Sequence, residues 1–197
     1  MPRPMTSGEL FTLAGTSNPQ PQTGEGNNAP MPELINSYAE GDLRKNASIG
    51  YITCSSTLWQ AKTYPYVKKF VRTHSLNGNH GMNWPIFRYS EVLLFMAEAL
   101  NEQGKTAEAA TFMNQVRKRA GLAEATASTQ AAFRTALMNE RRWELAFENK
   151  RWHDLVRTDT FKERITAKGN AIKADPFAHY YEKGYTLRSN SFTIIEK

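Results

Sequence analysis

The sequence has almost no cysteine and no long apolar run. Cys54 is the single cysteine among 197 residues, so no disulfide can form within the chain. No window reaches the roughly 18 apolar residues that a membrane-spanning helix requires. The opening residues, MPRPMTS, do not have the apolar stretch of a secretory signal peptide. We therefore expect a chain with neither a transmembrane segment nor an internal disulfide.

A concentrated block of one charge is also missing. The net charge is +6, from 25 basic and 19 acidic residues. The residues before Phe87 include seven Lys and Arg and five Asp and Glu. The residues from Phe87 to the end include eighteen Lys and Arg and fourteen Asp and Glu. Nucleic-acid-binding domains gather their basic residues on one face or stripe, and this chain does not. The sequence therefore predicts no nucleic-acid partner.

Motifs for catalysis and metal binding are absent as well. The sequence has no G-x-S-x-G elbow, and Cys54 has no neighbour typical of an activated nucleophile. His74 and His80 are six residues apart in a Gly/Asn-rich segment, which is not the spacing of a metal site, and His153 and His179 are isolated. We expect no metal, no cofactor and no enzymatic activity.

What the sequence does contain is a helical hairpin over residues 88–121. Apolar residues recur at helical spacing in two stripes, which are Tyr89, Val92, Leu93, Met96 and Leu100, then Ala109, Phe112, Met113, Val116 and Ala120. Gly104 stands where a left-handed cap is needed, and Gly121 ends the second helix. The small side chains of Ala97 and Ala109 allow the backbones of the two helices to approach closely. The 34 residues match the size of a tetratricopeptide repeat, and the alternative is a plain antiparallel pair in another all-α domain.

A third, long helix is predicted from the stretch LMNERRWELAFENKRWHDLVR. Glu140, Glu144 and Glu148 are four residues apart, so their side chains stack along one side of a helix. Basic residues stand close by, at positions 141, 142, 151 and 157. Hydrolytic carboxylates face each other across a cleft, whereas these lie beside arginines that keep them ionised. We expect a structural ion network, formed by Glu140, Arg141, Glu144, Glu148 and Arg151.

Aromatic residues are interleaved with these charges. Trp143, Phe147 and Trp152 indicate that much of the helix is half buried, and the two tryptophans are expected inside. Guanidinium groups can stack on such rings and meet carboxylates in fork geometry.

The flanking segments carry weaker signals. Residues 1–32 hold six of the nine prolines and have loop composition. A short helix is predicted at 33–38, followed by a turn that an Asp42–Arg44 pair holds. Residues 47–75 predict two or three short strands, with Pro65 confining its segment to an edge or loop. A helix is predicted to about Lys168, and an aromatic cluster after it is expected to pack back onto the hairpin, namely Phe177, His179, Tyr180, Tyr181 and Tyr185.

Three strings together resemble a known family. RYSEVLLFMAEALNE, NQVRKRAGL and ERRWELAFENKRWHDLVR are similar to the C-terminal half of the SusD/RagB family, nutrient-capturing outer-membrane lipoproteins of Bacteroidetes. The resemblance covers roughly residues 83–158, with a weaker likeness over SYAEGDLR. Where the family commonly has Gly in its AFEG-R-W string, this chain has Asn149, a residue that also tolerates left-handed backbone.

The resemblance and the pattern together predict the organisation. The expected fold is mainly α, with a tetratricopeptide-like hairpin and a long charged and aromatic helix preceded by loop-rich and short β segments. We expect one C-terminal SusD/RagB-like region over 1–197, divided into a ligand-facing part (1–86), a helical core (87–158) and an irregular C-terminal part (159–197). Family members are longer and a lone repeat buries its face poorly, so a fragment of a longer protein is expected. The alternative is a genuine short homologue.

The function that the resemblance implies is non-catalytic binding of glycans or oligosaccharides at the extracellular face of the outer membrane. The chain would deliver them to a TonB-dependent (SusC-like) transporter. Cys54 is not the family's lipid-bearing cysteine, because no apolar stretch with a charged start precedes it. Stacking aromatics and hydrogen-bonding amides gather before the hairpin, and the predicted ligand residues are Trp59, Gln60, Tyr64, Tyr66, Asn77, Asn79 and Trp84. Trp59 is the strongest candidate.

Two other functions stay open at this point. One is a helical-repeat scaffold that binds another protein and has no saccharide affinity. The other is an enzyme that uses Glu144, for which the sequence offers the least support.

Overall fold

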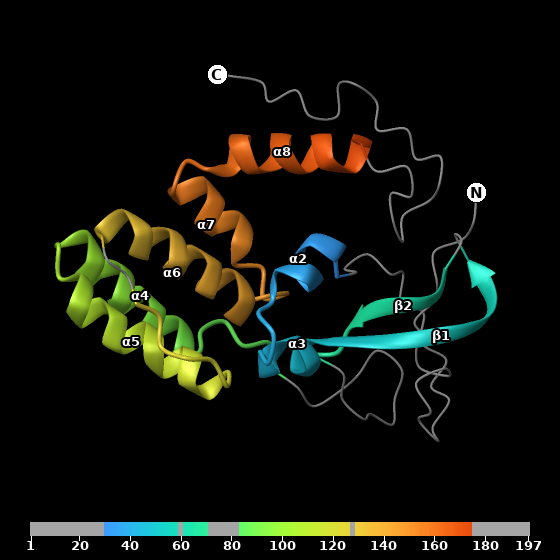
Figure 1. The fold of residues 1–197 in the computed structure, drawn as a ribbon, viewed down its shortest axis with the longest axis horizontal. Coiled ribbons are helices and arrows are strands. Elements are labelled where there is room, and N and C mark those ends of the chain that lie inside the picture. The colour runs from blue at the N-terminus through green and yellow to red at the C-terminus, as the bar shows by residue number, and fades with distance from the viewer. Residues whose placement is uncertain (1–29, 59–60, 71–82, 127–128, 175–197) are drawn as a thin grey trace. The chain divides into compact units, whose positions relative to one another are not determined.

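The computed structural model describes residues 30–58, 61–70, 83–126 and 129–174. Their elements follow the order α2 (Pro32–Ser37), α3 (Leu43–Ser48), β1 (Ile49–Leu58), β2 (Ala61–Val67), α4 (Tyr89–Glu102), α5 (Thr106–Arg119), α6 (Gln130–Glu144), α7 (Arg151–Arg157) and α8 (Phe161–Ala174) (Figure 1). The predicted mainly α fold is confirmed. The chain divides into two compact units, and the described part of the first comprises residues 30–50, 67–70, 83–126 and 129–151.

Helices α4 and α5 form the predicted hairpin of this first unit. Gly104 closes the turn between them with φ +77°, the left-handed conformation in which a side chain is strained. Ala97 and Ala109 are both fully buried, so the two backbones approach closely where these small side chains meet. The second predicted stripe is confirmed at Met113 and Val116, which are buried on α5.

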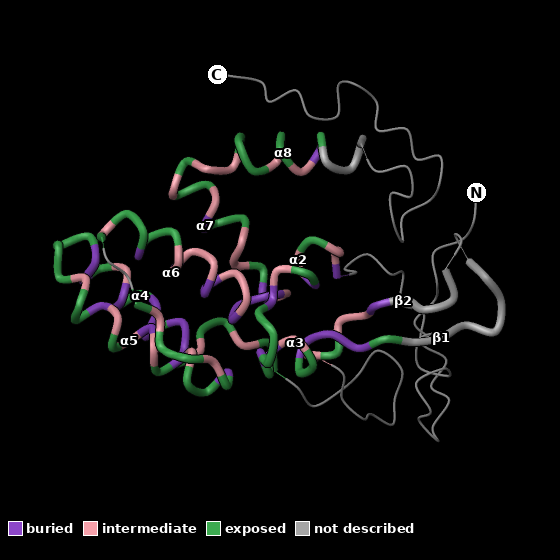
Figure 2. Tube along the Cα trace, viewed as in Figure 1, coloured by how far each residue is buried: buried purple, intermediate pink, exposed green. Residues whose placement is uncertain are grey.

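The predicted stripe on α4 is partly wrong. Leu93 and Leu100 are buried, but Tyr89, Val92 and Met96 are exposed, and the buried face is completed by Leu94 and Ala97 instead. The buried face of α4 differs from the predicted one because α4 packs against α6 as well as α5. The tube in Figure 2 shows buried and exposed positions alternating along these helices.

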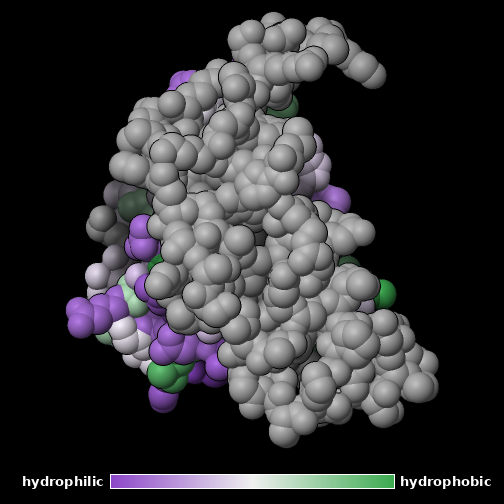
Figure 3. All heavy atoms as spheres, turned by 90° about the vertical axis from the view of Figure 1, so that its right-hand side faces the viewer, coloured by the Kyte–Doolittle hydropathy of each residue, from purple (hydrophilic) through white to green (hydrophobic). Residues whose placement is uncertain are grey.

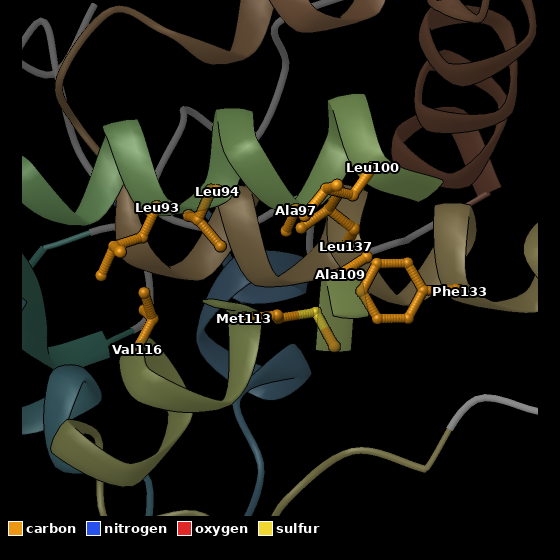
Figure 4. Packing of buried hydrophobic residues seen from close by; sticks show 9 residues of the cluster. All are labelled: Leu93, Leu94, Ala97, Leu100, Ala109, Met113, Val116, Phe133 and Leu137. Atoms are coloured by element: carbon orange, nitrogen blue, oxygen red, sulfur yellow. The ribbon is translucent and has the colours of Figure 1, made fainter. Parts of the chain in front are cut away.

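Helix α6 completes the core of this unit. Thr129 caps its first turn by accepting a hydrogen bond from the amide of Ala132 at 3.1 Å. Phe133 and Leu137 then project from α6 into the space between α4 and α5 (Figure 4). The cluster is wholly apolar, as the close packing of a small three-helix core requires, and contains Leu93, Leu94, Ala97, Leu100, Ala109, Met113, Val116, Phe133 and Leu137.

The long third helix that the sequence predicts is interrupted. Helix α6 ends at Glu144 and α7 begins at Arg151, so Glu148 lies in the turn between them. Two residues of this turn, Phe147 (φ +68°) and Asn149 (φ +59°), have left-handed backbone. A continuous right-handed helix cannot contain that conformation, and the side chains of Glu144 and Glu148 therefore do not continue one helical row.

Two short helices pack beside the end of α6. The predicted pair at the start of α3 is confirmed, because Asp42 accepts hydrogen bonds from the amide and the Nε of Arg44 at 2.9 Å. The indole Nε1 of Trp143 donates to Ser37 Oγ at 3.0 Å, which ties α2 to α6. Trp143 is half buried, and burial raises the pKa of the neighbouring Tyr38 hydroxyl to about 12.

The remaining described segments contribute a β-hairpin and the helices α7 and α8. β1 and β2 form a two-stranded sheet, so Pro65 lies on an edge strand as predicted. Helix α8 runs six residues past Lys168, to Ala174. Trp152 was expected to be buried, but 54% of it is exposed, and its ring centroid lies 6.0 Å from that of Phe161. The predicted aromatic cluster at 177–185 lies outside the described residues.

Candidate functional site

Three glutamates are buried among five basic side chains in the first unit. Glu140, Glu144 and Glu148 are each at most 3% exposed. We call the set the charge cluster, and it comprises these glutamates with Asp42, Arg44, Lys69, Arg88, Arg117 and Arg119. A buried carboxylate without such partners would be strongly destabilising.

Glu140 is held from two sides. Its Oε1 accepts from Arg44 Nη1 at 2.5 Å, and its Oε2 accepts from Arg117 Nη1 at 3.0 Å. Asp42 orients the Arg44 guanidinium through its second oxygen, at 2.8 Å from Nη2. These contacts join α3, α5 and α6 through charged hydrogen bonds, the strongest kind available to side chains.

Glu144 is shared by three arginines. Its Oε1 accepts from Arg88 Nη1 at 2.8 Å and from Arg119 Nη2, and its Oε2 lies 3.5 Å from Arg44 Nη1. Burial alone raises the pKa of Glu144, but the Arg119 hydrogen bond and the Arg88 charge outweigh it and bring the pKa below its usual 4.5. Glu144 is therefore ionised at neutral pH and cannot serve as a proton donor.

Glu148 bridges two cations that are distant in sequence. Arg88 Nε donates to its Oε2 at 2.8 Å, and Lys69 Nζ pairs with its Oε1. The same two cations also donate to main-chain carbonyls at the end of α6. Arg88 and Lys69 each donate to Glu144 O at 2.9 Å. Lys69 also donates to Ala146 O at 3.2 Å. Burial lowers the pKa of Lys69, and the Glu148 contact opposes that shift. Lys69 and Arg88 thus supply the donors that an interrupted helix end needs.

The cations seen to bind the glutamates lie on other elements than the one the sequence suggested. Local spacing predicts arginines of the same helix as partners, whereas these cations come from α3, α5 and the segments at 69 and 88. Arg141 instead lies 3.9 Å from Glu91 and stacks on Phe95, 4.6 Å from the ring centroid. Arg142 pairs with Glu33, and Arg151 is half buried.

An aromatic pair, of which Trp84 is exposed and Phe70 is half buried, stands next to the charge cluster in the chain. The rings of Phe70 and Trp84 are 4.7 Å apart between centroids and tilted by 37°. Phe70 directly follows Lys69, and Trp84 precedes Arg88 by four residues. Because Lys69 and Arg88 are both bound to Glu148, the chain is anchored on each side of the aromatic pair. Trp84 is 48% exposed, so one part of the indole is supported by Phe70 and another part faces solvent.

Comparison with known proteins places this geometry in a family. The model of the SusD family matches residues 44–197, which include the whole hairpin and charge cluster except Asp42. The chain belongs to the SusD family.

Individual relatives extend this SusD-family match. The SusD-like protein P25 of Formosa agariphila is 31% identical over 163 residues, 78% of this chain and 30% of that protein. A SusD homologue of Bacteroides thetaiotaomicron superposes with a TM-score of 0.60 at 26% identity, over 77% of this chain and 38% of its own. A surface glycan-binding protein A of Bacteroides uniformis superposes with a TM-score of 0.54 at 31% identity. The match covers 66% of this chain and 29% of that protein. The chain therefore spans about a third of these proteins.

The predicted ligand residues of this SusD-family chain have different outcomes. Trp59, Gln60, Asn77 and Asn79 lie outside the described residues. Tyr64 and Tyr66 belong to β2, and Tyr66 is half buried. Trp84 is the predicted residue whose exposure and ring contact are defined. Phe70, its neighbour, was missed, because its alternation with lysines gave no orientation.

The described residues were compared with what a metal site and a membrane span require of their side chains, and they meet neither requirement. Among the described residues, no three His, Cys, Asp or Glu side chains gather in a way that could hold a metal ion. No helix within residues 30–174 that the structure describes is long and apolar enough to span a bilayer. Hydrophilic side chains predominate among the described residues visible in Figure 3.

The stability of this unit is expected to fall in acid because of Glu144. A carboxylate whose pKa is lowered in the folded state stabilises fully above its unfolded pKa of 4.5, and this contribution is lost as the pH falls through the folded pKa. Urea denaturation between pH 7 and pH 3 measures it. We expect Glu144→Gln to be less stable at pH 7 but to have the flatter pH profile. Parallel profiles for the two proteins would show that Glu144 is not the responsible group.

Proposed function

We propose that this chain is a non-catalytic glycan-binding component at the extracellular face of the outer membrane. Its ligand would be an oligosaccharide, passed on to a TonB-dependent transporter. SusD-family membership supports a binding role and an outer-membrane location. The surface glycan-binding protein A of Bacteroides uniformis, similar in fold and 31% identical, supports a saccharide as ligand.

The observation that carries the proposal is the exposed Trp84 ring supported by Phe70. Sugar rings present C–H faces that bind to flat aromatic surfaces, and binding is strongest when the aromatic side chain is already held in place. Phe70 restrains the indole, and the bridge of Lys69 and Arg88 to Glu148 restrains the backbone on both sides. Each carboxylate of the charge cluster is paired with at least one basic side chain, which supports binding without catalysis.

Isothermal titration of the full chain against a panel of oligosaccharides tests this. We expect saturable binding of at least one saccharide, weakened about tenfold or more by Trp84→Ala, which corresponds to ~1.4 kcal/mol. Trp152→Ala is the matched control, since Trp152 is comparably exposed but is not paired with Phe70. No saccharide binding, or equal losses in both variants, would reject the site.

A protein-binding scaffold without saccharide affinity is the second candidate. The exposed apolar residues along α4 favour it, because contiguous apolar surface marks interaction sites. Co-purification of the chain with a transporter, together with no response to any saccharide, would support this candidate over the first.

A further inference from the structure

A second surface of the first unit has the features of a binding groove. It is an open hollow of about 420 Å³ where the start of α4 meets the end of α5. Arg88, Tyr89 and Leu93 line it from the α4 side, and Gln115, Val116 and Arg119 line it from α5. None of these residues belongs to the aromatic pair, so a ligand can occupy this groove without contacting Phe70 or Trp84.

The groove carries excess positive charge. Among the residues that the structure describes, two arginines line it and no carboxylate does. Arg88 and Arg119 both donate to the same oxygen of Glu144, whose other oxygen faces Arg44, so three guanidiniums share one buried carboxylate. The charge cluster as a whole has five basic and four acidic side chains.

Arg119 is the solvent-exposed arginine of this group. Its side chain is 58% exposed although one of its nitrogens is fixed on Glu144. A guanidinium has five N–H donors in a planar fork that suits a carboxylate. The buried carboxylate therefore orients Arg119, and its exposed edge faces solvent at the groove.

The floor and the neighbouring surface are apolar. Leu93 and Val116 face each other across the helix pair (Figure 4). Tyr89, 74% exposed, stands at the rim, and Val92 and Met96 continue its line along α4 at the i+3 and i+7 positions, both exposed. Tyr89 is aromatic, but Leu93, Val116, Val92 and Met96 are not, and this mainly non-aromatic surface suits the apolar side chains of a peptide.

We infer that this groove binds an acidic peptide segment of a protein partner. A carboxylate of the segment lies against Arg119 and Arg88, and an adjacent apolar side chain lies on Tyr89, Val92 and Met96. Charge complementarity selects this partner, because the described residues that line the groove offer guanidinium donors and no acidic side chain that would repel it. Such contacts weaken as salt screens the exposed Arg119.

A hexapeptide display library panned against the full chain tests the inference. We expect enrichment of peptides in which Asp or Glu adjoins an aliphatic or aromatic residue. The best peptide, measured by fluorescence anisotropy, should bind at least about tenfold more weakly to Arg119→Gln, a loss of ~1.4 kcal/mol. Arg134→Gln is the matched control, because Arg134 is an exposed arginine paired with Glu102 outside the groove.

A second variant separates binding from folding. Val92→Glu adds a negative charge at an exposed position beside the groove without touching the charge cluster, and it should also weaken the peptide about tenfold. Trp84→Ala should bind the peptide as the unchanged chain does. The inference is overturned if the library shows no acidic preference, or if neither Arg119→Gln nor Val92→Glu affects binding. It is also overturned if an oligogalacturonate, rather than any peptide, binds in an Arg119-dependent way.

Discussion

Glu144→Gln is expected to lower the free energy of unfolding by about 3–5 kcal/mol, the range for breaking one side of a buried ion pair. The amide has nearly the same shape, so the change removes charge rather than volume. Arg88, Arg119 and Arg44 then share no carboxylate at this position, and Arg88 and Arg44 are largely buried. Arg88 retains Glu148, and Arg44 retains Asp42 and Glu140, which keeps the expected loss within this range.

Urea denaturation of the full chain at pH 7 measures the effect, with Glu102→Gln as the matched control. Glu102 pairs with Arg134 on the surface, where its pKa is lowered mainly by that hydrogen bond. An exposed ion pair contributes little, so the control should unfold at nearly the midpoint of the unchanged chain. If the two variants shifted the midpoint equally, the charge cluster would not stabilise the unit as we describe.

Phe133→Ala is expected to cost about 3–5 kcal/mol, the usual range for removing a fully buried phenylalanine. The ring is completely buried where α6 meets α4 and α5. Truncation leaves a cavity that close-packed neighbours cannot fill. The loss should appear as a lower thermal midpoint and a lower urea midpoint with an unchanged denaturant slope.

Phe112→Ala on α5 is the control for this second prediction. Phe112 is the same residue type but only half buried against the same cluster, so its truncation exposes less new apolar surface. We expect a clearly smaller loss. A loss for Phe112→Ala that equals the loss for Phe133→Ala would mean that α6 is not packed into the hairpin as described.

The helical hairpin was predictable because its signals are local. Helical spacing of apolar residues and a glycine at the turn define two helices whatever else the chain contains. The orientation of α4 was not predictable in the same way. Apolar residues occur on most sides of this helix, and Leu94 and Val92 are equally hydrophobic candidates. The position of α6, a tertiary feature, decides that Leu94 is the buried one.

The break after Glu144 and the partners of the glutamates have the same cause. The stretch ELAFEN contains neither Gly nor Pro, and Asn149, which tolerates left-handed backbone, is the local sign of a break within it. The left-handed Phe147 is compensated by Lys69 and Arg88, which bind the carbonyls at the helix end. These cations lie 75 and 56 residues before Glu144, so local spacing carries no information about them.

Tryptophan fluorescence during saccharide titration tests the central claim most directly, because it reports on the Trp84 ring itself. We predict a saturable change in emission on adding the bound oligosaccharide to the full chain. The change should disappear in Trp84→Phe and persist in Trp152→Phe. An emission change that survives Trp84→Phe unaltered would show that the ligand binds elsewhere and would contradict the account.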